Sequence, residues 1–251
     1  MTRREDDSIV SSGGRGGPGR KYEVSGREVK NAVLYEAEAV VEESERRKVI
    51  LEKSYVSHLG DWLTLARLIW GQMLKMGFDK ADRLVVLSDG AEWIRSLCEW
   101  LPVKVILILD LYHVKHRVWE TGATLYGEGS EACKQWSEEH CKLIEEGKAE
   151  EVIERLEQLK QSHRKSREQI ERLERYLRNN LDRMDYPRYR GEGLRVGSGV
   201  VESTNYHVTG ARLKLAGMRW SEEGAGQMSS LRADLFNGVW RERSQQLLKA
   251  A

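Results

Sequence analysis

The chain has 251 residues, 40% of them apolar and 32% charged, which suits one mid-sized domain or a compact domain with one insertion. Its 41 basic and 40 acidic residues give a net charge of +1, so any nucleic-acid role needs a local basic patch rather than a global field. The three cysteines form no C-x-x-C pair, which argues against a disulfide framework or a cysteine zinc site and predicts a reducing, cytoplasmic location. No segment approaches the length of an apolar membrane span, so a membrane partner is not expected.

The amino-terminal third begins with a glycine-rich segment and continues with two strand-like runs. Residues 11–20 hold five glycines and one proline, which predicts an irregular, disordered segment over residues 1–26. The runs Val29–Ala39 and Lys48–Val56 flank a charged turn and predict an antiparallel hairpin. Apolar residues then recur at helical spacing from Asp61 to Met76, with Asp61 as the expected N-cap and Gly77 as the stop.

Two short apolar strands follow, Arg83–Leu87 and Val103–Leu109, with a helix between them over Ala91–Trp100. Strand, helix and strand in so few residues are typical of a parallel β-α-β unit. From Tyr112 to about Asp185 the pattern is helical, and its charged stretch predicts two amphipathic helices with solvated outer faces. A dimerising coiled coil is the alternative, although fewer than three clean heptads are present.

The last third begins with an expected loop over Tyr186–Gly199 and continues with two helices. The first helix is expected over Val200–Leu215, and the second runs from Ser221 to about Arg241. Together the elements predict an α/β domain interrupted by an all-helical insertion. Its core would comprise residues 27–111 and 191–251, and the insertion residues 112–190.

Candidate chemistry begins with two carboxylates that follow the two parallel strands, Asp89 in LSDGAEW and Asp110 in LDLYH. Ligand sites of open α/β sheets gather at that edge. Either residue can also be a simple helix N-cap. Asp110, His113 and His116 form D-x-x-H-x-x-H, a second possible metal cluster, but no further histidine offers the spacing of a third strong zinc ligand.

A third carboxylate, Glu202, lies in GSGVVEST at the expected start of a helix, where the helix dipole favours an ionised side chain. An ordinary capping role is again the alternative. The window Tyr186–Trp220 holds six basic and two acidic residues, and this surplus is typical of chemistry on a phosphate backbone. The candidate DNA-binding residues are Arg188, Arg190, Arg195, Arg212, Lys214 and Arg219.

Three stretches together resemble DDE transposases of bacterial insertion sequences, most nearly the ISKra group of the mutator-like superfamily. They are SDGAEWIRSL, LDLYHVKHRVWE and GSGVVESTNYHVTGARLKLAGMRW. The resemblance implies a ribonuclease H-like mixed sheet flanked by helices, with a helical insertion before the final glutamate. By that pattern Asp89 and Glu202 are catalytic metal ligands, while Asp110 and His113 match a motif that acts near the active site or the transposon-end DNA.

The resemblance also implies the reaction and its participants. Two Mg²⁺ or Mn²⁺ ions would support phosphoryl transfer on DNA, with transposon ends and target as partners and a homo-oligomer as the active complex. The family's first catalytic Asp follows a buried strand, whereas only Asp6 and Asp7 lie upstream of the hairpin here. We therefore expect a copy truncated at its N-terminus with an impaired metal site. The alternatives are a ribonuclease H-like endonuclease without strand transfer and a non-catalytic helical interaction protein.

Overall fold

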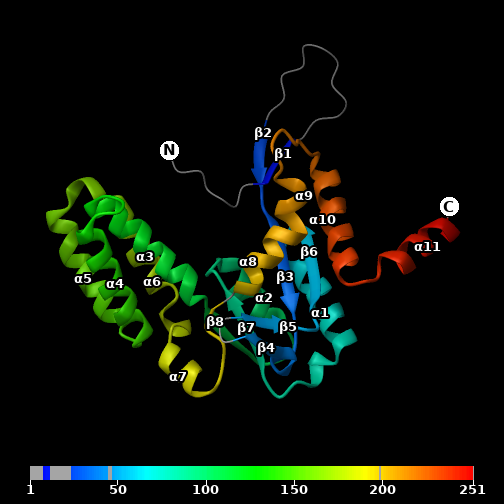
Figure 1. Ribbon diagram of the computed structural model, residues 1–251, viewed down its shortest axis with the longest axis horizontal. Coiled ribbons are helices and arrows are strands. Elements are labelled where there is room, and N and C mark those ends of the chain that lie inside the picture. The colour runs from blue at the N-terminus through cyan, green and yellow to red at the C-terminus, as the bar shows by residue number, and fades with distance from the viewer. Residues whose placement is uncertain (1–7, 12–23, 45–46, 198, 251) are drawn as a thin grey trace, which may run out of the picture. The chain divides into compact units, whose positions relative to one another are not determined.

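The structure is a computed structural model that describes residues 8–11, 24–44, 47–197 and 199–250. The chain divides into two compact units, unit 1 comprising residues 1–81 and 199–251, and unit 2 comprising residues 82–198. Both units contain helices and strands, so the α/β class is confirmed (Figure 1). The described strands pair two by two in four separate sheets. They do not form the single mixed sheet expected from the sequence, and the ribonuclease H-like assignment stays a prediction.

The hairpin predicted in unit 1 forms, but each of its two runs is divided into two strands. β3 (Val29–Leu34) pairs antiparallel with β6 (Ser54–Leu59), and β4 (Val40–Ser44) pairs with β5 (Arg47–Ile50) in a sheet of its own. A short 3₁₀ turn at Ala37–Ala39 separates β3 from β4. The hydrophobic pattern marks extended chain but does not reveal where the chain bends, so the sequence could not predict this division.

The amino-terminal segment differs from the sequence expectation where it is described. Strands β1 (Ser8–Ser11) and β2 (Val24–Arg27) pair antiparallel there, in place of irregular chain. The backbone hydrogen bonds of such a ladder satisfy polar groups that an irregular segment leaves to water. The glycine-rich residues 12–23, on which the expectation of disorder rested, lie outside the described residues.

The first helix of unit 1, α1 (Trp62–Met76), confirms its predicted boundaries. The side chain of Asp61 accepts a hydrogen bond of 2.8 Å from the backbone N–H of Thr64, and Gly77 ends the helix in the left-handed region at φ 74°. A carboxylate cap at the start and a glycine at the end satisfy backbone groups that the helix itself leaves unpaired. The buried face consists of Leu65, Ala66, Ile69 and Met73.

The carboxyl-terminal helices of unit 1 are more divided than the sequence predicts. The expected helix over Val200–Leu215 consists of three consecutive helical segments. They are α8 (Gly199–Thr204), a π-helical segment over Asn205–Gly210 and α9 (Ala211–Leu213). The last expected helix instead splits into α10 (Glu222–Phe236) and α11 (Trp240–Ala250). Gly238, at φ 73°, lies in the break between them. A glycine in that conformation is a common helix stop.

Two asparagines hold unit 1 together across long sequence distances. Asn31 on β3 donates hydrogen bonds to the side chains of Asn205 (2.9 Å) and Thr209 (2.6 Å). Asn237, after α10, accepts from the backbone N–H of Tyr55 (2.7 Å) and donates to the carbonyl of the same residue (2.9 Å). The Asn237 amide therefore pairs with β6 as a neighbouring strand would.

Unit 2 begins with the predicted β-α-β arrangement. β7 (Leu84–Ser88) and β8 (Val105–Leu109) pair in parallel, and α2 (Glu92–Trp100) connects them. Leu84 lies opposite Val105 and Ser88 opposite Leu109, so the strands end at the same edge. This edge carries Asp89 and Asp110, which positions both carboxylates for the site described below.

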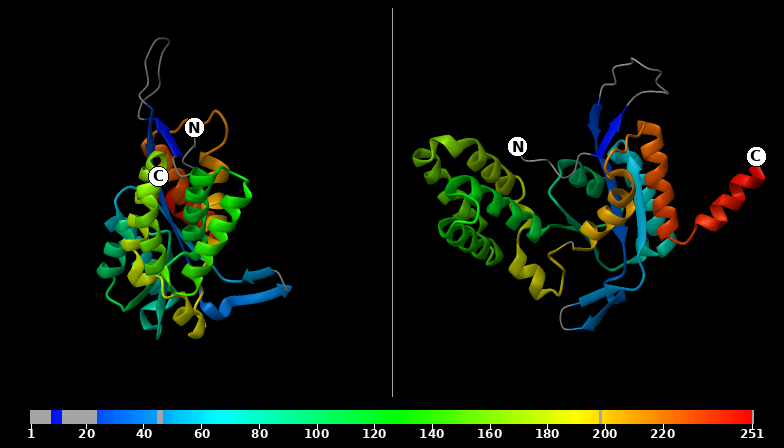
Figure 2. Two further views of the ribbon diagram at one scale, coloured as in Figure 1. Left: turned by 90° about the vertical axis from the view of Figure 1, so that its left-hand side faces the viewer. Right: turned by 45° about the horizontal axis from the view of Figure 1, so that its top comes forward.

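The helical block of unit 2 follows β8 and is confirmed as helical over most of its length (Figures 1 and 2). Its helices are α3 (Leu111–Tyr126), α4 (Glu131–Glu145), α5 (Ala149–Ser162), α6 (Arg167–Arg178) and α7 (Tyr186–Gly191). The loop expected over Tyr186–Gly199 is wrong in its first part, which is α7. Asp185 caps this helix through the N–H of Arg188, and Pro187 lies in its first turn, where a missing N–H costs nothing.

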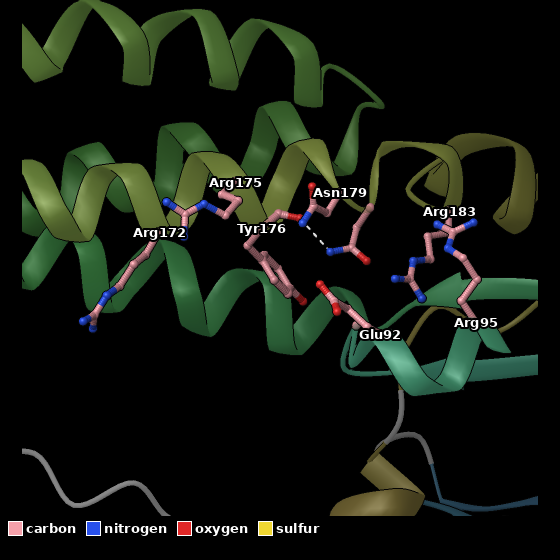
Figure 3. A pocket seen from close by; sticks show the side chains of 9 residues that line it. Glu92, Arg95, Arg172, Arg175, Tyr176, Asn179 and Arg183 are labelled. Carbon is pink, nitrogen blue, oxygen red and sulfur yellow. Dashed lines mark hydrogen bonds between the residues drawn. The ribbon is translucent and has the colours of Figure 1, made fainter. Parts of the chain in front are cut away.

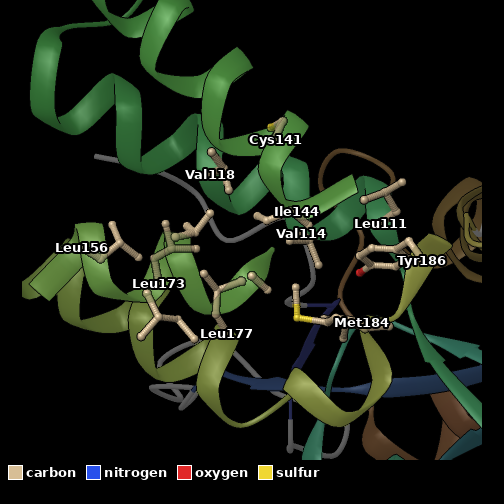
Figure 4. Close-up of a cluster of buried hydrophobic side chains, with 14 of the residues drawn as sticks. Leu111, Val114, Val118, Cys141, Ile144, Leu156, Leu173, Leu177, Met184 and Tyr186 are labelled. Atoms are coloured by element: carbon tan, nitrogen blue, oxygen red, sulfur yellow. The ribbon is translucent and has the colours of Figure 1, made fainter. Parts of the chain in front are cut away.

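The amphipathic helices α5 and α6 pack against each other and against α3 and α4. The apolar residues of α5 and α6 lie in one core with residues of β8 and α3 and with residues around α7 (Figure 4). Leu156, Ile170 and Leu177 are fully buried there. Intramolecular packing thus covers the apolar faces that the coiled-coil alternative would have paired between chains. In the described parts of the chain, no helix is both long and apolar enough to cross a membrane.

Candidate functional site at the carboxyl ends of β7 and β8

Two carboxylates meet at one edge of the parallel pair in unit 2. The backbone N–H of Asp110 donates a 2.7 Å hydrogen bond to the carbonyl of Ser88, the residue before Asp89. This bond continues the β7–β8 ladder by one step, so the two acidic residues leave the sheet side by side. The prediction that both lie at the carboxyl edge is confirmed.

Asp110 is the N-cap of α3. Its side chain accepts hydrogen bonds from the backbone N–H groups of Tyr112 (2.7 Å) and His113 (3.3 Å), and the residue is buried. These bonds satisfy two of the four free N–H groups at the start of the helix. Asp110 therefore has the capping role that the sequence left open beside a catalytic one.

Asp89 is exposed and does not cap α2. The helix begins at Glu92 with Ala91 as its N-cap, and Asp89 Oδ1 accepts from the Ala91 N–H at 3.1 Å. Between them Gly90 has φ 96°, and a Cβ there would lie 2.9 Å from Leu109 Cδ1. The turn therefore needs glycine, and it holds Asp89 at the sheet edge with its carboxylate open to solvent.

Tyr176, on α6, connects the helical block to this turn. Its hydroxyl donates a 2.9 Å hydrogen bond to the backbone carbonyl of Asp89. Burial raises the pKa of Tyr176, and the charge of Asp89 raises it further, so the hydroxyl stays protonated as a donor. Sequence reasoning missed this residue, because nothing in its local pattern indicates a partner 87 positions away.

His113 lies half-buried between α3 and α6. Its Nε2 accepts from the Nε–H of Arg117 at 3.3 Å, and its ring centroid lies 6.2 Å from that of Tyr176. Burial lowers the pKa of His113, while the charges of Asp89 and Asp110 oppose that change. The imidazole is therefore mostly neutral at neutral pH, a form that can accept a proton.

A metal centre is not formed by the described side chains of unit 2. No group of three His, Cys, Asp or Glu residues placed to hold an ion occurs in the described ranges. The cluster suggested by D-x-x-H-x-x-H is therefore wrong. Asp110 is used as a cap, and His116 Nε2 lies 3.4 Å from Glu120 Oε1 on the outer face of α3. Asp89 offers the hard oxygen that Mg²⁺ or Mn²⁺ prefers, but only as a single ligand.

The side chains of the other predicted acidic residues lie outside the part of the chain that the structure describes. Glu202 lies in α8 of unit 1, and its side chain is outside the description, as are Asp6 and Asp7. The pairing of Asp89 with Glu202 across one metal site stays a prediction.

The six predicted DNA-binding residues belong to two units. Arg188, Arg190 and Arg195 are in unit 2, whereas Arg212, Lys214 and Arg219 are in unit 1. Arg188 pairs with Asp185 at 3.1 Å, and Arg190 lies 3.7 Å from Glu145. Each of these two pairings offsets part of the positive charge counted in the sequence.

A different set of arginines surrounds a cavity beside Asp89. The cavity has a volume of about 520 Å³ and lies wholly within unit 2, between the start of α2 and the end of α6 (Figure 3). Its charged lining consists of Glu92, Arg95, Arg172, Arg175 and Arg183. Gly90 and Tyr176, which shape the Asp89 turn, line it as well. The sequence did not predict it, because these arginines belong to stretches that read as ordinary solvated helix faces.

The chain resembles two curated proteins of Caldanaerobacter subterraneus subsp. tengcongensis. One is "UPF0236 protein TTE2489", 27% identical over 217 residues, which cover 78% of this chain and 41% of the relative. The other, also 27% identical over 217 residues, is a UPF0236 protein whose name joins eleven designations, and 40% of its length is covered. The chain thus spans about two fifths of the length of the relatives it matches. No solved structure matches it. Residues 21–249 match the uncharacterised protein family UPF0236, and the chain therefore belongs to that family.

Proposed function

We propose that this chain is a DDE-type transposase of the ribonuclease H-like class, which cleaves and joins DNA strands by phosphoryl transfer. The observation that carries the proposal is the accessible carboxylate of Asp89 at the carboxyl edge of a parallel strand pair, beside a cavity lined by four arginines. Carboxylates that hold divalent cations and arginines that contact phosphates are the two requirements of this chemistry.

The proposed roles follow the surroundings of each residue. Asp89 and Glu202 would supply oxygen ligands to Mg²⁺ or Mn²⁺, which stabilise charge on attacking and leaving oxygens when bound. His113, neutral and close to the charge of Asp89, would accept or return a proton at the edge of the site. Asp110 would act indirectly, by holding the start of α3 and thereby the position of His113.

One feature of the relatives supports a mobile element. The name that joins eleven designations fits one protein encoded at many positions of a single genome. Multiplication of an element by transposition produces that pattern, and a housekeeping enzyme has no need of it. The partners in this proposal are transposon ends and target DNA in the cytoplasm, bound by a homo-oligomer.

The test is a strand-cleavage and strand-joining assay with the full chain. Supercoiled plasmid and a labelled oligonucleotide with a free 3′-hydroxyl are incubated with Mg²⁺ or Mn²⁺, and gels report nicking and joining of the label. We expect both products in small amounts, because the impaired metal site expected from the sequence slows the reaction. Asp89→Asn and Glu202→Gln should each reduce them to the level of a protein-free control.

The matched control is Asp82→Asn, which removes an exposed carboxylate just before β7, at the opposite end of the same strand. It should retain full activity. Nicking without joining would favour the endonuclease alternative. Equal activity of Asp89→Asn and the unmodified chain would refute a catalytic site at this edge.

A further inference from the structure

Arg183 is an unusual buried cation in unit 2. The residue is 3% exposed, and its Nε and Nη1 have no hydrogen-bond partner among the described residues. A buried charged group without a partner is costly, so proteins seldom keep one unless something else satisfies it. The side chain lines the cavity beside Asp89.

The carboxylate of the preceding residue, Asp182, already pairs with another arginine. Both oxygens of Asp182 accept hydrogen bonds of 2.9 Å from the guanidinium of Arg95, in a bidentate pair. Burial lowers the pKa of Arg183, and the charge of Arg95 lowers it further, so the environment disfavours this cation until an anion approaches. The charge of Asp182 partly opposes this change, but its two oxygens are occupied by Arg95, and no described carboxylate forms an ion pair with Arg183.

The wall formed by α6 adds a second cation. Arg175 is exposed and forms no ion pair within the described ranges, whereas its neighbour Arg172 pairs with Glu168. Glu92 contributes one negative charge to the rim. Four arginines and one glutamate line the cavity, and Arg183 and Arg175 form no ion pair within the described ranges, so the lining is electropositive. The volume of the cavity exceeds that of a phosphate group.

We propose that this cavity binds a phosphate group of a nucleic-acid strand, with Arg183 and Arg175 as its ligands. The planar guanidinium donates two parallel hydrogen bonds to phosphate oxygens, a geometry that an ammonium cannot provide. In naming a DNA strand as the occupant the inference rests on the proposed function. The proposed subsite lies between α2 and α6, beside Asp89. Its arginines are distinct from the six basic residues of the Tyr186–Trp220 window.

The test measures binding of a fluorescently labelled single-stranded oligonucleotide to the full chain, by anisotropy at several salt concentrations. We expect Arg183→Met and Arg175→Met each to weaken binding by about tenfold. Each variant should also reduce the slope of log affinity against log salt by about one, because one phosphate contact is lost. Arg178→Met is the matched control, since Arg178 lies on α6 like Arg175, pairs with Glu174 and does not line the cavity.

Two further measurements separate the possible results. Arg183→Met should melt no lower than the unmodified chain, because it removes a buried charge without removing a hydrogen bond, so a binding loss could not be ascribed to misfolding. Unchanged oligonucleotide affinity in both cavity variants would overturn the inference, even if inorganic phosphate raised the melting temperature. Binding that depends on the cavity in a chain that neither nicks nor joins DNA would uphold the subsite and reject the transposase proposal.

Discussion

The hydroxyl of Tyr176 lies 2.9 Å from the backbone carbonyl of Asp89, and this hydrogen bond ties helix α6 to the end of strand β7. The helical block is thus attached to the turn that presents the candidate carboxylate. A shift of α6 would therefore move the backbone of that turn.

Removing the hydrogen bond between Tyr176 and Asp89 should destabilise the folded chain. Tyr176→Phe keeps the ring but removes the donor, and we expect a loss of about 1 kcal/mol in the free energy of unfolding, measured by urea denaturation. Tyr126→Phe is the control, because no described residue bonds the hydroxyl of Tyr126 while its ring packs in the same core. Equal stability of the two variants would contradict a stabilising role for the bond.

The turn itself should depend on glycine at position 90. Gly90→Ala introduces both an unfavourable positive φ and a Cβ that would meet Leu109 and Tyr176. We expect a loss of roughly 1–3 kcal/mol in unfolding free energy. Gly129→Ala shares the positive φ, at 76°, but its Cβ would meet nothing within 4 Å. The additional loss of unfolding free energy in Gly90→Ala, relative to Gly129→Ala, measures the contribution of close packing around Gly90. Equal losses in the two variants would show that this packing is unimportant.

The two strand-end carboxylates should differ in what they support. Asp110→Ala removes a buried N-cap and should lower the unfolding free energy by about 1 kcal/mol. Asp89→Ala removes an exposed side chain with one weak hydrogen bond, so its unfolding free energy should change little while nicking and joining are lost. Denaturation curves and the plasmid assay on both variants test these two roles. An Asp89→Ala variant less stable than Asp110→Ala would contradict them.

Stability should fall in mild acid because of a buried histidine in α4. His140 is buried against Trp136, its Nδ1 bonds the Trp136 carbonyl at 2.7 Å, and its Nε2 has no partner among the described residues. Burial lowers the pKa of His140 in the folded chain, so the unfolded chain binds the proton more readily. The contribution of this neutral imidazole is complete above its unfolded pKa of about 6.5 and is lost as the pH falls below it.

The measurement is the free energy of unfolding between pH 7.5 and 5. His140→Gln cannot titrate in this range, so its stability should depend on pH less steeply than that of the unmodified chain. Parallel curves for the two proteins would exclude His140 as a source of the acid sensitivity.

Local signals made much of the fold predictable. The cap at Asp61 and the stop at Gly77 define α1 without help from the rest of the chain, because both act within one turn of helix. Continuous apolar runs with Asp89 and Asp110 at their ends predicted the edge where the two carboxylates meet. The division at Ala37–Ala39 was missed because periodicity does not show where extended chain bends. The helix α7 was missed because its six residues are too few to show helical periodicity.

By itself the sequence determined most of the helices and the parallel strands of this protein and the residue types at its candidate site, because helix spacing, strand runs and caps are encoded within a few neighbouring residues. Only the tertiary structure decided which residues share a surface. In the tertiary structure Asp110 caps a helix, Asp89 stays exposed and Tyr176 bonds the Asp89 turn. Arg183 is buried there, with no hydrogen-bond partner for its Nε and Nη1 among the described residues. These outcomes depend on contacts between segments far apart in the chain, and no local pattern carries that information.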